Sequence, residues 1–248
     1  MSHKGTVVDF LRYPHPCLPS PNPNILGGFD ASAIVSRILV KTLGVRSRIL
    51  RQNIWRHEAG RGRLFARTYA EIVGLEAFKT VHLLEIGCGP GAVAGAFFEL
   101  GCSVRAMDLR DGRIFWHPDI EFARGDACQY QEARIFDVVS LTSVLHHIGA
   151  DDAALIIGKV RSTLCPGGLL LMQEDILGPR SVMNLLIKTG DDLVSGEVGT
   201  HQAESHRTTK EWVTLVTELG FSLVGTKSLF PNWLGVGVEK AFFVFEKV

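Results

Sequence analysis

Three glycines alternate in LLEIGCGPGA, which runs from Leu83 to Ala92, at positions Gly87, Gly89 and Gly91. An apolar stretch typical of a buried strand precedes them, and a pattern typical of a helix follows. Bare glycines at the first turn of an open α/β sheet let backbone N–H groups and the helix N-terminus approach a ligand. Because Ala92 fits the last place of G-x-G-x-x-G/A, the turn alone leaves a dinucleotide and another adenosine ligand both open.

Asp108 ends the next predicted strand, about 20 residues after the glycines, where its carboxylate can accept hydrogen bonds from two ribose hydroxyls. An ordinary tight turn would explain the glycines alone, and a solvated loop would explain the carboxylate alone. Their combination in a strand, turn, helix, strand unit favours an adenosine-containing ligand.

His146 and His147, in the segment VLHHIG, are the residues best suited to accept a proton near neutral pH. Successive residues on a helical turn diverge by about 100 degrees, so one ring is expected to face the reacting group, and His146 is favoured. Glu174 and Asp175 end the fifth predicted strand, where one of them is expected to orient that histidine. The alternative is one buried histidine, one surface histidine and two surface carboxylates.

Alternating strands and helices after Lys79 must position these residues. The expected strands are VHLLEI, SVRAMD, IEFA (120–123), FDVVS (136–140), GLLLMQE (168–174), FSLVGTKSL and KAFFVFEK. Helices are expected at 92–100, at 151–164 before the stop signal CPGG (165–168), and after a capping box at Thr208–Glu211. This alternation predicts a doubly wound, mostly parallel α/β sheet.

The first 79 residues are expected to form a mainly helical N-terminal cap, with apolar periodicity from Asp30 to Leu43 and from Leu64 to Val73. Five of the ten prolines lie in residues 13–24, which predicts an extended segment. Residues 80–248 form the main domain. Within it, 177–207 is too long for an ordinary connection and is expected to be a lid or substrate-binding insertion.

Four motifs in order resemble those of the class I methyltransferases, which bind S-adenosylmethionine. They are E-x-G-x-G-x-G from Glu85, Asp108, GDA at 125–127 and PGG at 166–168, and HRTTKEWVTLVTELGF (206–221) looks like the last helix and strand of that family. The resemblance implies a Rossmann-like sheet of seven strands with the last strand antiparallel. It also implies that the glycine turn need only accommodate an amino acid tail and a sulfonium, because this cofactor has no pyrophosphate.

The resemblance also implies the cofactor-binding residues. Glu85 and the glycine turn would surround the methionine part, Asp108 would bind the ribose, and Asp126 with the Ala127 amide would read the adenine edge. The full predicted set is Glu85, Gly87, Cys88, Gly89, Gly91, Asp108, Leu109, Gly125, Asp126, Ala127, Leu141 and Thr142. His201, His206 and Arg207, in or beside the insertion, are the predicted substrate-binding residues. The predicted acceptor is a small organic molecule, with a hydroxyl oxygen favoured and N- or C-methylation by proximity as alternatives.

Composition indicates the cellular compartment and limits the kinds of partner that the protein could have. Lys plus Arg and Asp plus Glu balance at 26 each, and the five cysteines form no C-x-x-C pair, which favours a reducing cytoplasm without disulfides or zinc. The absence of a long apolar run predicts no membrane partner. A non-catalytic binding protein of the same fold is the competing class, and a nicotinamide oxidoreductase is a more distant one. Oligomeric state is left open.

Two local features suggest further partners, and each has a simpler explanation. Seven arginines and one acid lie in residues 45–67, which is typical of a solvated helix face but also of a dock for an anionic substrate or RNA. Enzymes of this fold that methylate base amino groups carry Asn/Asp-Pro-Pro-aromatic where this chain has Ser140-Leu141-Thr142-Ser143, so no nucleic acid partner is expected. Three residues of the insertion could bind a metal: His201, Glu204 and His206. They are expected to be polar surface residues instead, because metal-dependent methyltransferases carry other residues after strands four and five.

Overall fold

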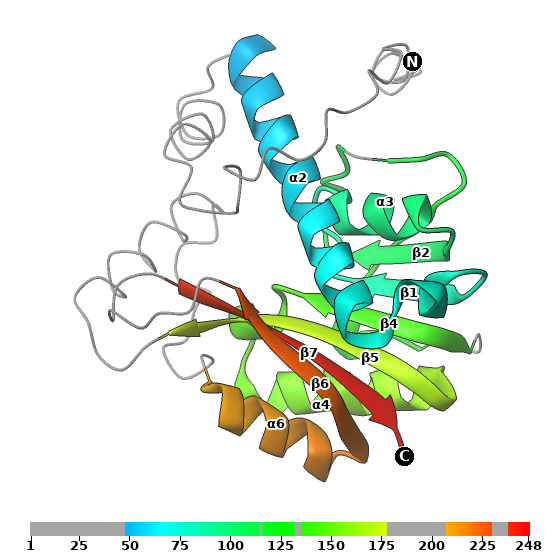
Figure 1. The fold of residues 1–248 in the computed structure, drawn as a ribbon, viewed down its shortest axis with the longest axis vertical. Coiled ribbons are helices and arrows are strands. Elements are labelled where there is room, and N and C mark those ends of the chain that lie inside the picture. Colours follow the sequence, from blue (N-terminus) through cyan, green and yellow to red (C-terminus); the bar gives the residue numbers. More distant parts are fainter. Residues whose placement is uncertain (1–47, 115, 132–134, 178–206, 230–237) are drawn as a thin grey trace. The chain divides into compact units, whose positions relative to one another are not determined.

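The computed structural model describes residues 48–114, 116–131, 135–177, 207–229 and 238–248 (Figure 1). The helix expected at 30–43, the proline-rich segment, and the insertion with His201 and His206 lie outside the described residues. The predicted N-terminal cap is therefore described only from residue 48 onward.

Seven strands form one sheet. They are β1 (His82–Ile86), β2 (Ser103–Asp108), β3 (Glu121–Arg124), β4 (Phe136–Thr142), β5 (Leu164–Leu177), β6 (Phe221–Leu229) and β7 (Val238–Lys247). The strand order is β3-β2-β1-β4-β5-β7-β6; β7 pairs antiparallel with β5 and with β6, and every other pair is parallel. The predicted fold is confirmed. Strands β1 to β3 are added towards one edge of the sheet, and the strands from β4 onward lie on the other side of β1. The strand order therefore reverses between β1 and β4, and ligands of such sheets bind at this point.

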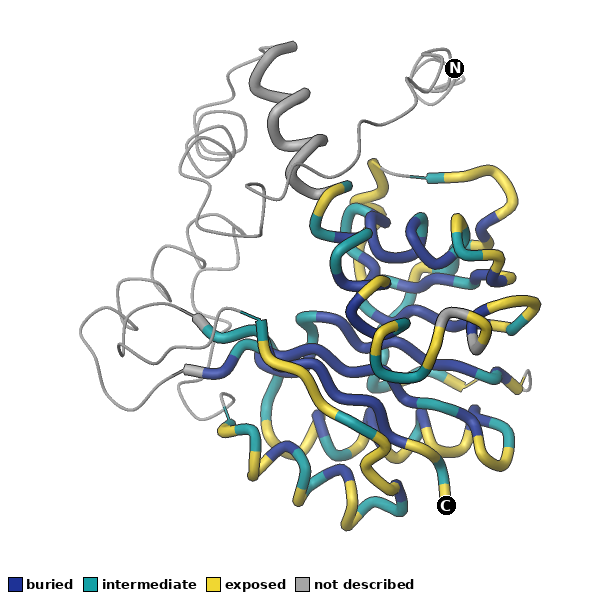
Figure 2. Tube along the Cα trace, viewed as in Figure 1, coloured by how far each residue is buried: buried dark blue, intermediate teal, exposed yellow. Residues whose placement is uncertain are grey.

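Helices cover both faces of the sheet (Figure 1). They are α2 (Arg48–Val73), α3 (Ala92–Glu99), α4 (Ala150–Thr163) and α6 (Thr209–Glu218), with short 3₁₀ turns η2 (Leu75–Phe78), η3 (Ala127–Gln129) and η4 (Leu145–His147). One apolar cluster joins α2 and α3 to the sheet through Phe65, Tyr69 and Phe97. The other joins α4 and α6 to the opposite face through Ile157 and Trp212. The middle strands are buried on both faces, as Figure 2 shows in dark blue.

Helix α2 packs directly on α3. The apolar pattern predicted a helix only near 64–73, but α2 begins at Arg48 and continues through two glycines. Gly62 is buried, and a Cβ atom on it would overlap the carbonyl group of Ala92, the first residue of α3. Arg63 forms a salt bridge of 3.0 Å with Glu99 at the other end of α3. The two helices therefore form one layer over the sheet.

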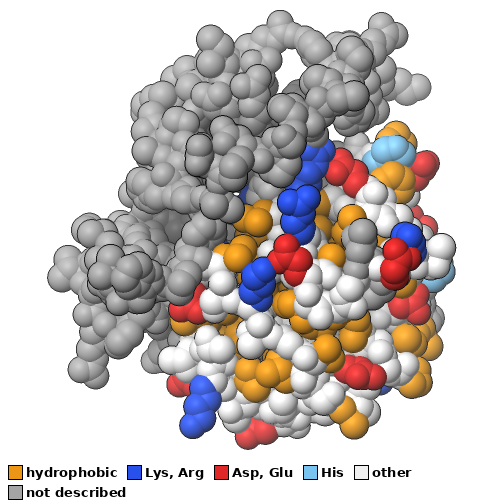
Figure 3. Space-filling view, viewed as in Figure 1, with side chains coloured by type: hydrophobic (Ala, Val, Ile, Leu, Met, Phe, Trp, Pro, Cys, Tyr) orange, Lys and Arg blue, Asp and Glu red, His pale blue; other side chains and the backbone are white. Residues whose placement is uncertain are grey.

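Acidic partners lie close to basic side chains on the face that α2 covers, as the adjoining blue and red side chains in Figure 3 show. Besides the Arg63–Glu99 pair, Lys227 of β6 pairs with Glu71 of α2. Arg63 is the one residue of the arginine-rich stretch in these two pairs, so the solvated helix surface expected for that stretch stays a prediction.

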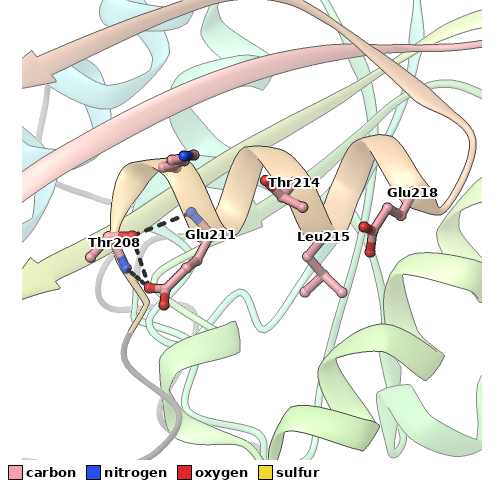
Figure 4. A pocket seen from close by; sticks show the side chains of 6 residues that line it. Thr208, Glu211, Thr214, Leu215 and Glu218 are labelled. Atoms are coloured by element: carbon pink, nitrogen blue, oxygen red, sulfur yellow. Dashed lines mark hydrogen bonds between the residues drawn. The ribbon is translucent and has the colours of Figure 1, made fainter.

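Two local sequence signals had different outcomes. Thr208 and Glu211 form the predicted capping box of α6, with the Thr208 side chain accepting from the Glu211 amide and the Glu211 carboxylate accepting from the Thr208 amide (Figure 4). The CPGG segment was predicted to separate α4 from a strand beginning at Gly168, but β5 already begins at Leu164. A register shift against β4, with Gly167 at φ 72°, accommodates these residues within the strand.

Substitution of Gly62 tests the contact between α2 and α3. Gly62→Ala should lower the free energy of unfolding by about 1–3 kcal/mol, because the added methyl group forces the two helices apart. Gly60→Ala is the matched control: a Cβ there meets nothing within 4 Å, so better helix propensity should leave stability equal or slightly higher. Thermal or urea unfolding of both variants measures this, and equal stability of the two would contradict the close packing.

Candidate active site

The glycine turn connects β1 to α3 in a left-handed backbone that a larger residue would strain. Gly87, Gly89 and Gly91 have φ values of 74°, 49° and 85°. The amides of Gly87 and Cys88 both donate to the carbonyl oxygen of Met107 in β2, at 2.8 and 3.1 Å. The N-cap residue of α3, Gly91, has no side chain, and the Glu85 carboxyl group accepts a hydrogen bond from the Ala94 amide in the first turn of the helix. The turn is thus held from β2, while the start of the helix keeps the geometry that favours polar or anionic ligand groups.

Asp108 lies at the end of β2, directly beside this turn. Its Oδ2 atom accepts a hydrogen bond from the Gly89 amide at 2.8 Å, and its Oδ1 atom accepts from the Arg110 amide at 3.0 Å. The carbonyl oxygen of Asp108 accepts from the Gly125 amide at 3.0 Å. The predicted ribose-binding carboxylate is therefore brought together with the glycine turn and with the loop that follows β3.

Asp126 begins the short turn η3 in that loop. Its Oδ1 atom accepts from the Cys128 amide at 2.8 Å, and the side chains of Asp126 and Ala127 are both partly exposed. Leu109 is 59% exposed on the neighbouring loop. The residues predicted for the ribose and for the adenine thus lie on adjacent loops at the carboxyl ends of β2 and β3.

Glu85 is the buried carboxyl group of the site. It lies in β1 at 2% exposure, and its Oε2 atom has no hydrogen-bond partner in the described part of the chain. Burial raises the pKa of Glu85 to about 8; a hydrogen bond from the Ala94 amide lowers it and the Asp108 charge raises it. An unpaired buried carboxyl oxygen beside a glycine turn fits the ammonium group in the amino acid tail of S-adenosylmethionine.

Further polar side chains lie on the same face of the sheet as Glu85, under α2. Ser140 and Thr142 of β4 are buried and share a hydrogen bond of 3.0 Å, and buried Gln173 of β5 accepts from the Ser143 hydroxyl at 2.5 Å. Ser143 has a left-handed φ of 57°. Motif reasoning used only Leu141 and Thr142 here. The missed signal was the alternation of polar residues in otherwise apolar runs, as in VVSLT and LLLMQED.

The histidine turn η4 is fixed by a buried carboxylate. Glu174 of β5 accepts hydrogen bonds from the Leu145 amide at 2.9 Å, from the His146 amide at 3.1 Å and pairs with His146 Nδ1 at 2.5 Å. The exposed fraction of His146 is only 3%. Burial acts to lower the pKa of His146, but the Glu174 charge and hydrogen bond outweigh it, so the pKa is raised. The His147 ring packs on His146 with centroids 4.0 Å apart and is partly exposed.

Asp175 faces the other side of the sheet. Neighbouring residues in a strand point in opposite directions, and Glu174 is the one hydrogen-bonded to His146. The charge of Asp175 also acts to raise the pKa of His146. Asp175 accepts from Gln173 Nε2 at 3.0 Å and from Lys240 Nζ at 2.5 and 2.6 Å. Although burial acts to raise it, Lys240 holds the pKa of Asp175 well below its usual range. Of the two carboxylates, Glu174 forms the hydrogen bonds to the histidine turn, and Asp175 acts on His146 through its charge.

The glycine turn and the histidine turn touch each other. A Cβ atom added at Gly87 would lie 2.5 Å from Cγ2 of Val144, the residue before η4. The turn after β1 and the turn after β4 therefore meet at the point where the strand order reverses. Arg207 precedes α6, with its guanidinium group 4.7 Å from the centre of the Trp212 ring. His201 and His206 lie outside the described residues.

Comparisons with known proteins agree with this geometry. The family described as "Methyltransferase domain" matches residues 84–172. The ubiquinone biosynthesis O-methyltransferase of Roseobacter denitrificans is 26% identical over 171 residues, which cover 65% of this chain and 68% of that protein. A methyltransferase structure from Bacillus halodurans has a TM-score of 0.56 at 16% identity, covering 72% of this chain and 99% of its own. An S-adenosylmethionine-dependent methyltransferase from Mesorhizobium loti has a TM-score of 0.54 at 18% identity, covering 68% and 92%.

The resemblance predicted from the sequence is confirmed: residues 84–172 match a methyltransferase domain, and the chain is similar to class I methyltransferases. It is an S-adenosylmethionine-dependent methyltransferase, and S-adenosylmethionine is the cofactor of this family. Among the described residues, no helix is both long and apolar enough to cross a membrane.

Asp108 provides the first test of the cofactor site. Asp108→Ala should weaken binding of S-adenosylhomocysteine by at least about 1.5 kcal/mol, because charge-assisted hydrogen bonds to the ribose are lost. Asp108→Asn retains an oxygen that can accept from the Gly89 amide but removes the negative charge. It therefore distinguishes loss of the ribose contact from loss of support for the glycine turn. Asp111→Asn on the same loop is the control, since Asp111 pairs with Arg113 at the surface. Calorimetry measures all three, and unchanged affinity in Asp108→Ala would place the ribose elsewhere.

Glu85 should make cofactor affinity depend on pH. Its pKa is about 8 without ligand, and a bound cationic group should lower that pKa, so the ligand must displace a proton at pH 7. Affinity should therefore rise with pH while Glu85 loses its proton, and fall again once the ligand's own α-ammonium, with an ordinary pKa of about 7.7–8.0, loses its charge. Glu85→Gln should bind more weakly and lose this rise. Calorimetry of S-adenosylmethionine between pH 6.5 and 8.5 measures both; a pH-independent affinity in the unmodified chain contradicts the assignment.

Proposed function

We propose that the protein transfers a methyl group from S-adenosylmethionine to a hydroxyl oxygen of a small organic molecule. Glu85, the glycine turn, Asp108 and Asp126 hold the cofactor, which supplies a methyl carbon activated by its sulfonium. The chain's own task is then to align the hydroxyl with that carbon and to remove its proton. The name of the Roseobacter relative, an O-methyltransferase, supports an oxygen acceptor.

The observation that carries the proposal is the turn held by Glu174. Three hydrogen bonds from η4 converge on one buried carboxylate, next to the residue that packs on the glycine turn. Such support is typical of a base whose position matters. Because His146 is buried in the pair with Glu174, we assign proton removal to the more exposed His147, and we assign His146 and Glu174 to holding its ring.

Incubation of the purified protein with S-adenosylmethionine and paired acceptors tests the reaction. Each pair should share one aromatic skeleton and carry either a phenolic hydroxyl or an amine. We expect S-adenosylhomocysteine and methyl ethers to form from the hydroxyl member. Methylation of the amines alone would contradict the oxygen acceptor, and cofactor binding without any transfer would favour a binding protein of the same fold.

Single substitutions separate the two histidines. His147→Ala should lower kcat by about 10²-fold with cofactor affinity kept, because the proton acceptor is lost. His146→Ala should mainly lower the free energy of unfolding, by about 3–5 kcal/mol, because it leaves the Glu174 carboxylate buried without its partner. His82→Ala, an exposed histidine at the start of β1, is the control. Normal turnover in His147→Ala would show that proximity alone drives the transfer.

A further inference from the structure

Tyr69 is a buried residue of α2 for which none of the sequence motifs gave a role. Its exposed fraction is 0%, and its ring packs against Phe97 of α3 at 6.1 Å and edge-on against Phe242 of β7 at 5.3 Å. These contacts fix the ring, so the hydroxyl group has a defined position. Within the described part of the chain that hydroxyl has no hydrogen-bond partner. An unpaired buried hydroxyl costs about 1–3 kcal/mol, which is unusual in a well-packed core.

The surroundings of this hydroxyl belong to the cofactor site. Burial is the main cause that raises the pKa of Tyr69; a hydrogen-bonding interaction with the Thr142 hydroxyl, which does not reach ordinary hydrogen-bond geometry, lowers it, and the Glu174 and Glu85 carboxyl groups add to the rise. Glu85 Oε2 is the second buried polar atom of this region without a partner. Glu85 and Thr142 lie on β1 and β4, the two strands between which the order of the sheet reverses. Two unpaired oxygens thus occur at the place where such a sheet binds its ligand.

The chemistry of these groups selects the sign of the ligand's charge. A phenol oxygen can accept a hydrogen bond or turn its lone pairs to a cation, and the charged groups that act on Tyr69 are both carboxylates. A positive ligand group beside Glu85 would favour the charged form of that carboxyl group, whose pKa is about 8 without ligand, and would be stabilised by it and by Glu174. A negative group would be repelled by Glu174 and would keep Glu85 protonated. S-adenosylmethionine carries two positive groups, the ammonium of its tail and the sulfonium.

We propose that Tyr69 is a cofactor-binding residue, whose hydroxyl oxygen contacts a positively charged group of the methyl donor together with Glu85. The inference rests on the cofactor assigned under the proposed function. It extends the site from the loops of the sheet to helix α2, which lies outside the stretch that matches the methyltransferase family. The contact between Gly62 and Ala92 places α2 against the start of α3 and thereby brings Tyr69 to the same region.

The test compares Tyr69→Phe with Thr68→Val. Tyr69→Phe keeps the ring and its packing and removes only the unpaired hydroxyl, so the ligand-free variant should unfold at the same temperature or a higher one. Its affinity for S-adenosylmethionine should fall by about 10-fold or more, because a hydrogen bond or close contact with a charged group is lost. Thr68→Val removes a buried hydroxyl from the same helix. That hydroxyl donates to the Leu64 carbonyl within α2, so this variant should bind the cofactor normally.

Three ligands identify the charged group. S-adenosylmethionine has both positive groups, S-adenosylhomocysteine has only the ammonium, and 5′-methylthioadenosine has neither. Loss of affinity in Tyr69→Phe for the first two supports contact with the amino acid tail, whose one positive group is the ammonium, and loss for S-adenosylmethionine alone supports contact with the sulfonium. Affinity for 5′-methylthioadenosine should stay within about twofold in either case. An equal loss for all three ligands, or no loss for any, would overturn the proposal. If the unmodified chain binds neither S-adenosylmethionine nor S-adenosylhomocysteine, the cofactor itself is wrong.

Discussion

The carbonyl oxygen of Met107 accepts two hydrogen bonds from the glycine turn, and the rest of the site depends on this attachment. Because β2 holds Gly87 and Cys88, the chain must reverse within a few residues and enter α3 at Ala92. That helix start is also where α2 approaches so closely that residue 62 must be glycine. A shift of α2 would therefore be transmitted to the turn that faces the cofactor. Through this contact α2 can affect the binding site, although α2 ends at Val73 and the first recognised motif begins at Glu85.

Polar side chains in the sheet are concentrated at one edge. Most of each central strand is apolar on both faces, as expected for a sheet covered by helices on both sides. Glu85, Ser140, Thr142 and Gln173 are exceptions, all buried near the carboxyl ends of their strands. Apolar residues there would cost less in the free protein, since an unpaired buried carboxyl group is expensive. The arrangement is understandable when a polar ligand completes the missing hydrogen bonds and offsets that cost.

The sequence predicted the parts of the fold that local patterns encode. Alternating strands and helices, the glycine turn and the Thr208–Glu211 capping box each depend on neighbours in the chain, and each is present in the structure. The extent of α2 could not be predicted in the same way, because glycines at 60 and 62 read as helix-breaking signals while one of them serves a tertiary contact. Tyr69 likewise fits the apolar face of a helix. Only the packed structure shows that its hydroxyl lacks a partner.

The two carboxylates at the end of β5 show a second feature that the sequence alone could not predict. Strand alternation requires Glu174 and Asp175 to face opposite sides, but it does not say which side meets the histidines. In the structure Glu174 belongs to the α4 face with His146, whereas Asp175 and the polar row under α2 belong to the other face. The cofactor residues and the histidine pair therefore start from different layers of the protein.

Val144, which packs on Gly87 and leads into the histidine turn, connects them across the edge of the sheet. Glu174 keeps that connection rigid, because one carboxylate binds two successive amides and a ring nitrogen of the same turn. Methyl transfer depends on alignment, and under the proposed function this turn would align a proton acceptor with the cofactor at the carboxyl ends of the strands.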